Sequence, residues 1–225
     1  QVTPHSYIEV FEPVLKEGKS ILDLSLSSGL TQTFDSVQLA AAELAEDYTE
    51  ARVVPVDSLS ATGGMGLLLE AAGANREAGM SIDDNAQWLR DHRLEVSHWF
   101  MVDDLMYLKR GGRIPATTAI LGTALNIKPI LHIDPQGHLV TLDKKRGLKQ
   151  AIKEVANRYK TLNSGVSNRV YIVHADCQES ADELEKAVLA INPQADIAKM
   201  MLCPIIGAHV GPGMYAAIFF GSREG

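Results

Sequence analysis

The sequence contains little cysteine, no excess of basic residues and no apolar stretch that reaches membrane-spanning length. Its two cysteines, Cys177 and Cys203, suit a reducing cytosol and lack the spacing of metal ligands. The formal net charge of −7 argues against nucleic-acid binding, because such proteins usually carry a basic face. No signal peptide is visible. We therefore predict a cytoplasmic protein with no nucleic-acid partner and at most transient membrane contact.

What is present is the composition of an ordinary globular protein, with 46% hydrophobic and 22% charged residues. A chain of 225 residues can form one large domain or two small ones. Short β-like runs alternate with helical patterns, which favours an α/β fold. Predicted strands cover residues 20–26, 52–56, 99–102, 130–133, 138–142, 170–173, 197–202 and 214–220. Predicted helices cover residues 36–45, 64–78, 81–95, 117–125, 148–162 and 181–191, and another opens with Thr3 as N-cap and Pro4 as its first residue.

The two halves of the chain differ in how these elements are connected. Strands and helices alternate in the first half, which implies parallel pairing with right-handed crossovers. The second half contains a hairpin around the turn at residues 134–137 as well as crossover connections. We therefore predict two α/β domains, a mostly parallel sheet domain at residues 1–96 and a mixed-sheet domain at residues 97–225.

Two hydroxyl-rich segments follow predicted strands of the first half. Residues 27–33 are Ser-Ser-Gly-Leu-Thr-Gln-Thr, and residues 56–64 are Val-Asp-Ser-Leu-Ser-Ala-Thr-Gly-Gly. Hydroxyls and backbone amides in front of a helix can bind an anion, and ligands of open α/β sheets lie at this edge. Capping of the following helix is the simpler interpretation of both segments.

Two glycine-rich segments lie in the second half. Residues 103–114 place Arg110 and Arg113 on either side of two glycines, which suits an anionic ligand or a partner protein. A linker that is salt-bridged through Asp103 or Asp104 is an equal alternative. Residues 207–213 hold His209 among three glycines and a proline, either as a tight strand-to-strand connection or as a loop that fixes the imidazole.

Two hydrolytic chemistries find no support in these segments. The nucleophile-elbow pattern Gly-x-Ser-x-Gly is absent. The seven histidines are far apart and include no His-x-x-x-His pair, so the sequence predicts neither a metal site nor any other cofactor.

Six segments taken together resemble the DegV family of bacterial fatty-acid-binding proteins, the acyl carriers that work with a fatty-acid kinase. They occur in the order and at the spacing of the family across nearly all of the chain. The segments are residues 27–33, residues 56–66, residues 105–114 (Leu-x-x-Leu-x-x-Gly-Gly-Arg-Ile), residues 126–130 (Asn-Ile-Lys-Pro-Ile), residues 144–149 (beginning Lys-x-Arg-Gly) and residues 207–213 (Gly-x-His-x-Gly-Pro-Gly).

The resemblance implies a two-domain protein that buries one fatty acid between its domains, with the carboxyl group facing the hydroxyl loops and the histidine. By position, Thr31 replaces the headgroup-binding serine of the family, Thr33 matches the threonine of the same loop, and His209 is the histidine near the carboxyl group. Thr3 belongs to what remains of a family Thr-Ser-Gln-Pro stretch whose hydroxyls reach the headgroup. Gln32 stands where the family usually has glycine. The opening strand of the family is missing, which suggests truncation before Gln1.

The first functional hypothesis is a non-catalytic protein that binds a long-chain fatty acid and presents its carboxyl group to a fatty-acid kinase, with Arg110, Arg113 and residues 144–146 as partner contacts. A second hypothesis is a phosphotransferase or hydrolase with His209 as general base, near Thr31 or Ser58. A third is a lipid sensor.

Two details of lipid binding are also expected. Side chains such as Met65, Leu68, Ile120 and Leu121 would shape the acyl tunnel. Headgroup affinity would fall as pH rises, because an imidazole titrates near neutrality.

Overall fold

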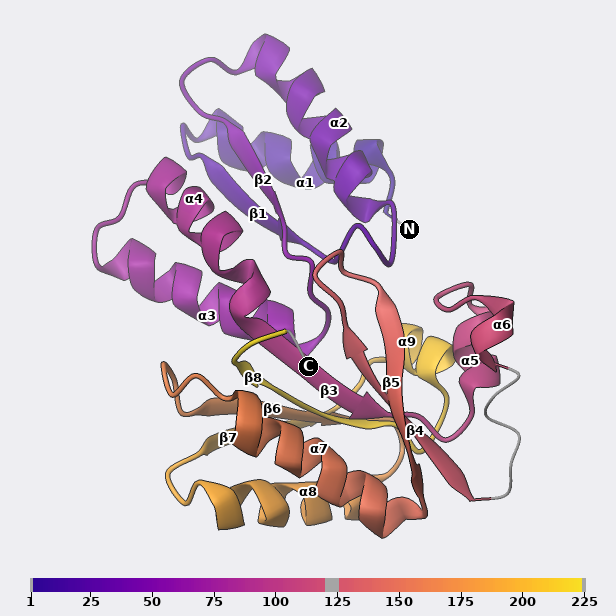
Figure 1. The fold of residues 1–225 in the computed structure, drawn as a ribbon. Helices are drawn as coiled ribbons and strands as arrows, with labels where there is room; N and C mark the ends of the chain where they lie inside the picture. Colours follow the sequence, from indigo (N-terminus) through magenta and orange to yellow (C-terminus); the bar gives the residue numbers. More distant parts are fainter. Residues whose placement is uncertain (1, 120–125, 224–225) are drawn as a thin grey trace. The chain divides into compact units, whose positions relative to one another are not determined.

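The computed structural model describes residues 2–119 and 126–223 and divides the chain into two compact units. Unit 1 comprises Gln1–Ala61 and Met65–Arg93, and unit 2 comprises Thr62–Gly64 and Leu94–Gly225. Each unit is built from helices and a sheet (Figure 1). The division therefore places residues 62–64 with the second half of the chain.

Unit 1 contains a two-stranded parallel sheet, as the alternation of strand and helix predicts. β1 (Ile21–Ser25) pairs with β2 (Val53–Asp57) in register from Ile21 opposite Val53, and α2 (Thr33–Asp47) connects the two strands. The remaining helices are α1 (Pro4–Lys16), α3 (Gly63–Glu77) and α4 (Ile82–His92). A core cluster joins α1 and α2 to this sheet through Phe11, Leu15, Val37, Leu44 and Ala51.

The start of α1 confirms the prediction made from Thr3 and Pro4. The Thr3 side chain accepts a hydrogen bond from the backbone N–H of Ser6 at 3.3 Å, and Pro4 occupies the first turn. By contrast, α2 begins three residues earlier than expected, at Thr33. The segment between β1 and α2 is correspondingly shorter, and Thr33 belongs to the helix.

Unit 2 contains a six-stranded mixed sheet in the order β5-β4-β3-β8-β6-β7. Its strands are β3 (Val96–Met101), β4 (Ile127–Ile133), β5 (Leu139–Arg146), β6 (Arg169–His174), β7 (Asp196–Met201) and β8 (Tyr215–Phe220). β6 and β7 are parallel, and the other pairs are antiparallel. The predicted hairpin is confirmed as β4 and β5, although both strands are longer than the sequence pattern indicates.

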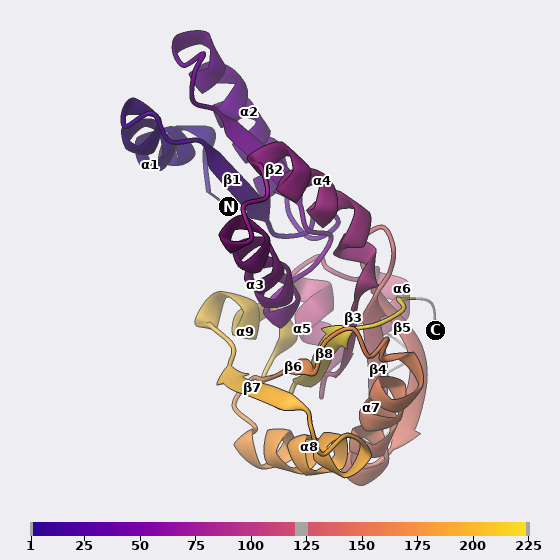
Figure 2. The same ribbon diagram turned by 90° about the vertical axis from the view of Figure 1, so that its left-hand side faces the viewer.

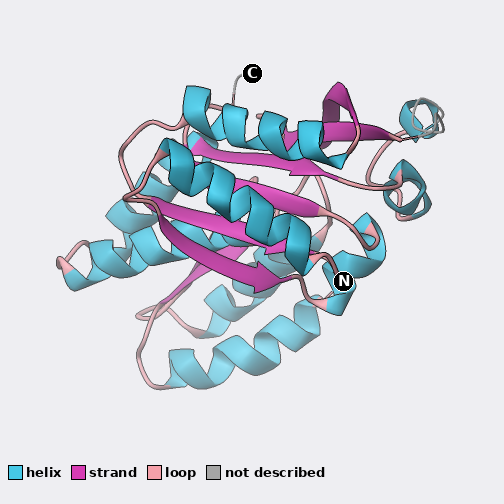
Figure 3. Ribbon diagram, turned by 90° about the horizontal axis from the view of Figure 1, so that it is seen from below, coloured by secondary structure: helices cyan, strands magenta, loops and turns pink. Residues whose placement is uncertain are grey.

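Two helices, α7 (Leu148–Leu162) and α8 (Gln178–Ile191), form the main core of unit 2 together with the sheet. Figure 3 shows two long helices laid across magenta strands. The bounds of α7 are those predicted, because its apolar residues repeat at helical spacing and face the sheet. Tyr159 of α7 meets Phe219 of β8 edge to face, with ring centroids 5.0 Å apart.

The two glycine-rich segments of the second half of the chain contain short helices. Residues 103–114 include α5 (Leu105–Arg110), and residues 207–213 begin inside α9 (Pro204–Val210). Both alternatives for residues 207–213, a tight strand-to-strand connection and a loop, missed the helix in whose last turn His209 lies. Pro204 is tolerated in the first turn of α9 because the N–H that proline lacks has no intrahelical partner there.

Some predicted features lie at the edge of the described residues. The helix expected at residues 117–125 corresponds to α6 (Ala116–Ala119) in its described part, whereas Ile120 and Leu121 lie outside it. A short 3-10 helix at Arg93–Glu95 follows α4. Among residues 2–119 and 126–223, no helix combines the length and apolar character needed to cross a membrane.

Asp23 provides a test of how the burial of a carboxyl group affects the stability of unit 1. This carboxyl group lies within β1 and accepts a hydrogen bond from the Ser25 hydroxyl at 2.6 Å. Burial raises the pKa of Asp23, and the hydrogen bond from Ser25 opposes that rise. Because the folded-state pKa exceeds the unfolded one, the contribution of Asp23 to stability is present below the unfolded pKa and is lost as pH rises through the folded pKa.

We therefore expect Asp23→Asn to raise the urea midpoint of unfolding at pH 7.5, and the gain to shrink toward pH 4. Glu43→Gln, a matched change at an exposed position of α2, should leave the midpoint almost unchanged. A lower midpoint for Asp23→Asn at pH 7.5 would contradict the burial penalty.

Candidate functional site

The two hydroxyl-rich segments of unit 1 lie side by side at the carboxyl ends of β1 and β2. The N–H of Ser27 donates to the carbonyl oxygen of Ser60 at 3.0 Å, and the N–H of Ser58 donates to the carbonyl oxygen of Ser25 at 3.1 Å. The structure thus joins residues 27–33 and 56–64, which the sequence suggested separately. This edge is where open α/β sheets bind ligands.

Asp57 and the serines of these segments hold the loops in place. The Asp57 carboxylate accepts hydrogen bonds from the N–H groups of Leu59 at 2.9 Å and Ser28 at 3.2 Å. The buried Ser58 hydroxyl donates to the carbonyl oxygen of Ser60 at 3.2 Å and accepts from its N–H at 3.1 Å. These groups are committed to loop structure, as in an Asx turn.

Thr31 and Thr33 form a pair of hydroxyl groups at the start of α2. Their Oγ1 atoms are 3.0 Å apart, and both residues are half-buried. The N-cap residue of α2 is Gln32, whose side chain makes no capping hydrogen bond. A helix N-terminus favours negative charge, so two hydroxyls at this position suit an anionic group.

The same edge carries backbone strain. Leu59 and Thr62 have φ angles of 46° and 49°, in the left-handed region that residues with a side chain rarely adopt. Strain of this kind is concentrated at functional sites. It supports a functional interpretation of residues 56–64 over simple capping.

Thr3 has a structural use. Its Oγ1 accepts from the Ser6 N–H and lies 3.0 Å from the Ser6 hydroxyl, in an exposed position. The hydroxyl that we assigned to the ligand is therefore the cap of α1 in this structure.

In unit 2, α5 and α9 pack against each other and bring together residues 105–114 and 207–213 (Figure 2). A Cβ atom at Gly111 would overlap Nδ1 of His209, and one at Gly211 would overlap the Tyr107 ring. Gly213, with a φ angle of 86°, lies against the Asp103 carboxylate. Gly111 and Gly211 are thus required by the close approach of α5 and α9.

His209 lies against the end of α5 and close to Arg113. Burial lowers the pKa of His209, and the positive charge of Arg113 lowers it further. The Arg113 guanidinium donates a hydrogen bond to the carbonyl oxygen of Gly111, which fixes it beside the imidazole. Both effects favour the neutral form of the imidazole.

The two arginines differ in environment. Arg110 is exposed at the end of α5, where its guanidinium carbon lies 4.9 Å from the centroid of the Tyr107 ring and its Nε donates to the Met106 carbonyl oxygen. Of the two acidic residues named in the salt-bridge alternative, Asp103 does form an ion pair, with Lys128 at 2.6 Å, whereas Asp104 caps α5.

Residues 126–130 and 144–149 meet as the paired ends of β4 and β5. Lys128 lies opposite Lys145, and the N–H of Gly147 donates to the carbonyl oxygen of Asn126 at 2.9 Å. Asn126, which precedes β4, and Gly147, which follows β5, have φ angles of 64° and 83°. Both are residue types that tolerate the left-handed region.

Sequence reasoning missed the partners of the glycine pair at the start of α3. A Cβ atom at Gly63 would overlap Tyr171 of β6, and one at Gly64 would overlap the buried ring of His98 on β3. The only signal in the sequence was the pair of glycines itself, since small residues allow backbone to approach closely. Within the described residues, no group of three or more His, Cys, Asp or Glu side chains could hold a metal ion.

The sequence of this chain matches a known protein family over nearly its whole length. A model of the family described as "Uncharacterised protein, DegV family" matches residues 1–222. The chain belongs to the DegV family. A DegV domain-containing protein of Clostridium perfringens is 36% identical over 225 residues, which cover 100% of this chain and 77% of that protein.

Solved structures of DegV proteins share the fold. A DegV family protein from Thermus thermophilus, whose structure is described as showing fatty acid binding, is 30% identical to this chain with a TM-score of 0.87. The match covers 98% of this chain and 78% of the Thermus thermophilus chain. The Fatty Acid Kinase B3 protein of Streptococcus pneumoniae, loaded with linoleic acid, is 21% identical with a TM-score of 0.88, covering 98% and 77%. This second likeness shows the fold alone. The predicted α/β architecture with two sheet domains is confirmed.

The contact between Gly111 and His209 gives a direct test of the α5–α9 geometry. Gly111→Ala should displace the imidazole and cost about 1–3 kcal/mol of stability, because overpacking forces the two helices apart. The matched control is Gly207→Ala on α9 itself, where a Cβ atom meets nothing within 4 Å. That change should stabilise the protein by about 0.5–1 kcal/mol, since alanine favours a helix.

Thermal unfolding of the two variants and the NMR chemical shifts of the His209 ring are the measurements. Equal stabilities for the two variants, with an unshifted His209 ring in Gly111→Ala, would show that α5 and α9 do not meet at these residues.

Proposed function

We propose that this DegV protein binds a long-chain fatty acid and presents its carboxyl group to a fatty-acid kinase, without itself catalysing the reaction. The observation that carries the proposal is the His209–Arg113 pair, held against Gly111 by α5 and α9. The Thermus thermophilus relative, at 30% identity, supports fatty acid as the ligand class.

The binding energy of such a ligand would come mainly from its tail. Each buried methylene contributes about 0.8 kcal/mol, so a long acyl chain offers roughly 10 kcal/mol before the costs of binding are subtracted. A buried carboxylate is costly unless it is hydrogen-bonded. We propose that the hydroxyls of Thr31 and Thr33 and the imidazole of His209 supply those bonds.

The charges near His209 suit the kinase step. A neutral imidazole donates a hydrogen bond to a carboxylate, whereas the permanently charged Arg113 attracts a group that gains negative charge on phosphorylation. Arg110, exposed one turn away, and residues 144–146 are the proposed kinase contacts. In this proposal Arg113 supplies the positive charge near the headgroup.

Mass spectrometry of lipid extracted from the purified protein tests the binding proposal. We expect a stoichiometric fatty acid, and acyl phosphate formation that requires an added fatty-acid kinase with ATP. Absence of lipid together with turnover of a phosphoryl or acyl substrate by the protein alone would instead favour the enzymatic alternative, in which the neutral His209 acts as general base.

Comparing a fatty acid with its methyl ester separates binding of the carboxyl headgroup from binding of the acyl tail. Thr31→Val and His209→Ala should each weaken fatty-acid binding by about 10–150-fold, the value of one hydrogen bond to a charged group, and change ester binding much less. Thr31→Ser, which keeps the hydroxyl, is the matched control and should bind as the unmodified protein does.

Binding of both ligands is measured by displacement of a fluorescent fatty acid. Equal losses for acid and ester would mean that these residues do not bind the carboxyl group, even if the lipid itself is confirmed by mass spectrometry.

A further inference from the structure

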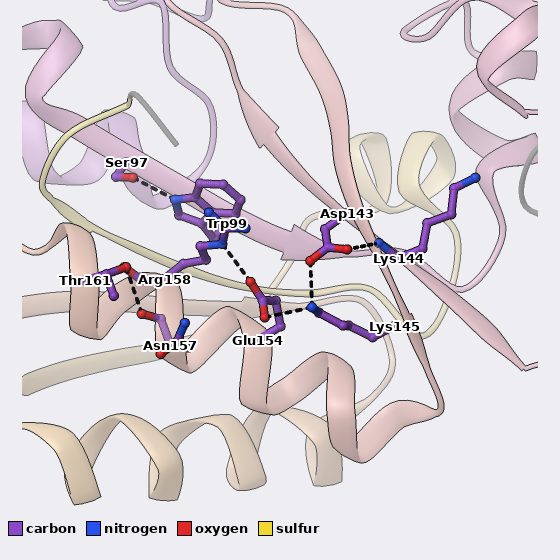
Figure 4. Close-up of polar contacts among 9 residues, drawn as sticks. All are labelled: Ser97, Trp99, Asp143, Lys144, Lys145, Glu154, Asn157, Arg158 and Thr161. Atoms are coloured by element: carbon purple, nitrogen blue, oxygen red, sulfur yellow. Dashed lines mark hydrogen bonds and ion pairs between the residues drawn. The ribbon is translucent and has the colours of Figure 1, made fainter.

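A second polar cluster in unit 2 lies around Trp99 and involves none of the proposed ligand-binding residues. Trp99 of β3 is fully buried, and its indole N–H donates to the Ser97 hydroxyl at 3.0 Å (Figure 4). The Arg158 guanidinium of α7 lies 4.4 Å from the centroid of the Trp99 ring system. Arg158 in turn binds Glu154, which also binds Lys145 of β5 at 3.1 Å.

His132 stacks on the same tryptophan. The two residues are direct partners in the β3–β4 ladder, and their ring centroids lie 5.1 Å apart with an angle of 19° between the planes. His132 is only 7% exposed. A change in the charge of the His132 imidazole would therefore change the electrostatic environment of the Trp99 ring directly.

Arg223 closes the cluster from the segment that follows β8. It is buried, and its guanidinium donates from Nε to the Val96 carbonyl oxygen at 2.7 Å and from Nη1 to the Asp134 carbonyl oxygen at 3.3 Å. The preceding Gly221 and Ser222 donate their N–H groups to Glu95 and Leu162 at 2.6 and 3.2 Å. The segment at residues 221–223 is thus attached to β3, to the turn after β4 and to the end of α7.

Protonation of His132 would place a further positive charge near the guanidinium groups of Arg158 and Arg223. The charged side chains that face the His132 ring are Arg158 from α7, Arg223 from the segment after β8 and Asp134 from the turn after β4. The residue opposite His132 on β5 is Val140, which carries no charge. Burial lowers the pKa of His132 and the two guanidinium groups lower it further, whereas Asp134 and a hydrogen bond to the Arg223 backbone oppose this. The neutral ring is the form that the folded cluster favours.

We propose that His132 is a pH-responsive latch, which holds residues 221–223 against β3 and β4 while its imidazole is neutral and releases them when the imidazole is protonated. Because the folded pKa is below the unfolded one, the latch is closed above the unfolded pKa and weakens as pH falls toward the folded value. This device is independent of the proposed fatty-acid site.

Trp99 provides an optical readout once the second tryptophan is removed. Trp88, which stacks on His92 in unit 1, is the other tryptophan of the chain, so Trp88→Phe leaves Trp99 alone. Between pH 8 and pH 5 we expect Trp99 emission to fall with a midpoint below 6.5. His132→Asn should abolish that transition.

Amide hydrogen exchange at Gly221 and Ser222 measures the latch itself in the unmodified protein, alongside NMR titration of His132. After correction for intrinsic exchange rates, the protection factors of both amides should fall as His132 protonates. The expected fall is about tenfold for each unit by which the pKa of His132 in the closed state lies below its pKa in the open state. The matched control is His138→Asn, which removes an exposed histidine whose Nδ1 lies 3.7 Å from Asp134 and should change nothing. Protection that stays constant across the titration of His132 would overturn the proposal.

Discussion

The close approach of α5 and α9 is the constraint on which the candidate site of unit 2 depends. It exists because Gly111 has no side chain where the His209 ring lies, and because Gly211 makes the same allowance for Tyr107. From this packing follow the partial burial of the imidazole and its proximity to Arg113, and from these the lowered pKa of His209. The chemistry of the histidine is thus determined by two backbone positions that carry no functional group.

Charge is distributed unevenly between the units, and this bears on how an anion could be bound. Acidic residues outnumber basic ones by more than two to one in unit 1, whereas unit 2 has slightly more basic than acidic residues. An anion near Thr31 and Thr33 in unit 1 would therefore rely on hydroxyl groups and the dipole of α2 rather than on a positively charged side chain of that unit.

The sequence predicted elements well where one local pattern dominates. The amphipathic spacing of α7 gave its bounds, and Thr3 with Pro4 gave the start of α1. It failed for α9, because glycine and proline at residues 204–213 are typical of loops unless the proline is known to occupy a first helical turn. The contact between Gly111 and His209 could not be derived from any local pattern, since it depends on the packing of two short helices far apart in the chain.

The hydroxyl loops show how structure divides residues that look alike in sequence. The serines at positions 27, 58 and 60 are fully buried and Ser58 exchanges hydrogen bonds with Ser60, so these residues stabilise the edge of the sheet. A buried serine whose hydroxyl already donates to a carbonyl oxygen is a poor nucleophile, because no base accepts its proton. The half-buried Thr31 and Thr33 hydroxyls, which lie 3.0 Å apart, are the ones that we propose as headgroup ligands. The hydroxyl of Ser58 is therefore engaged in loop structure rather than free for the nucleophilic role that the enzymatic alternative would give it.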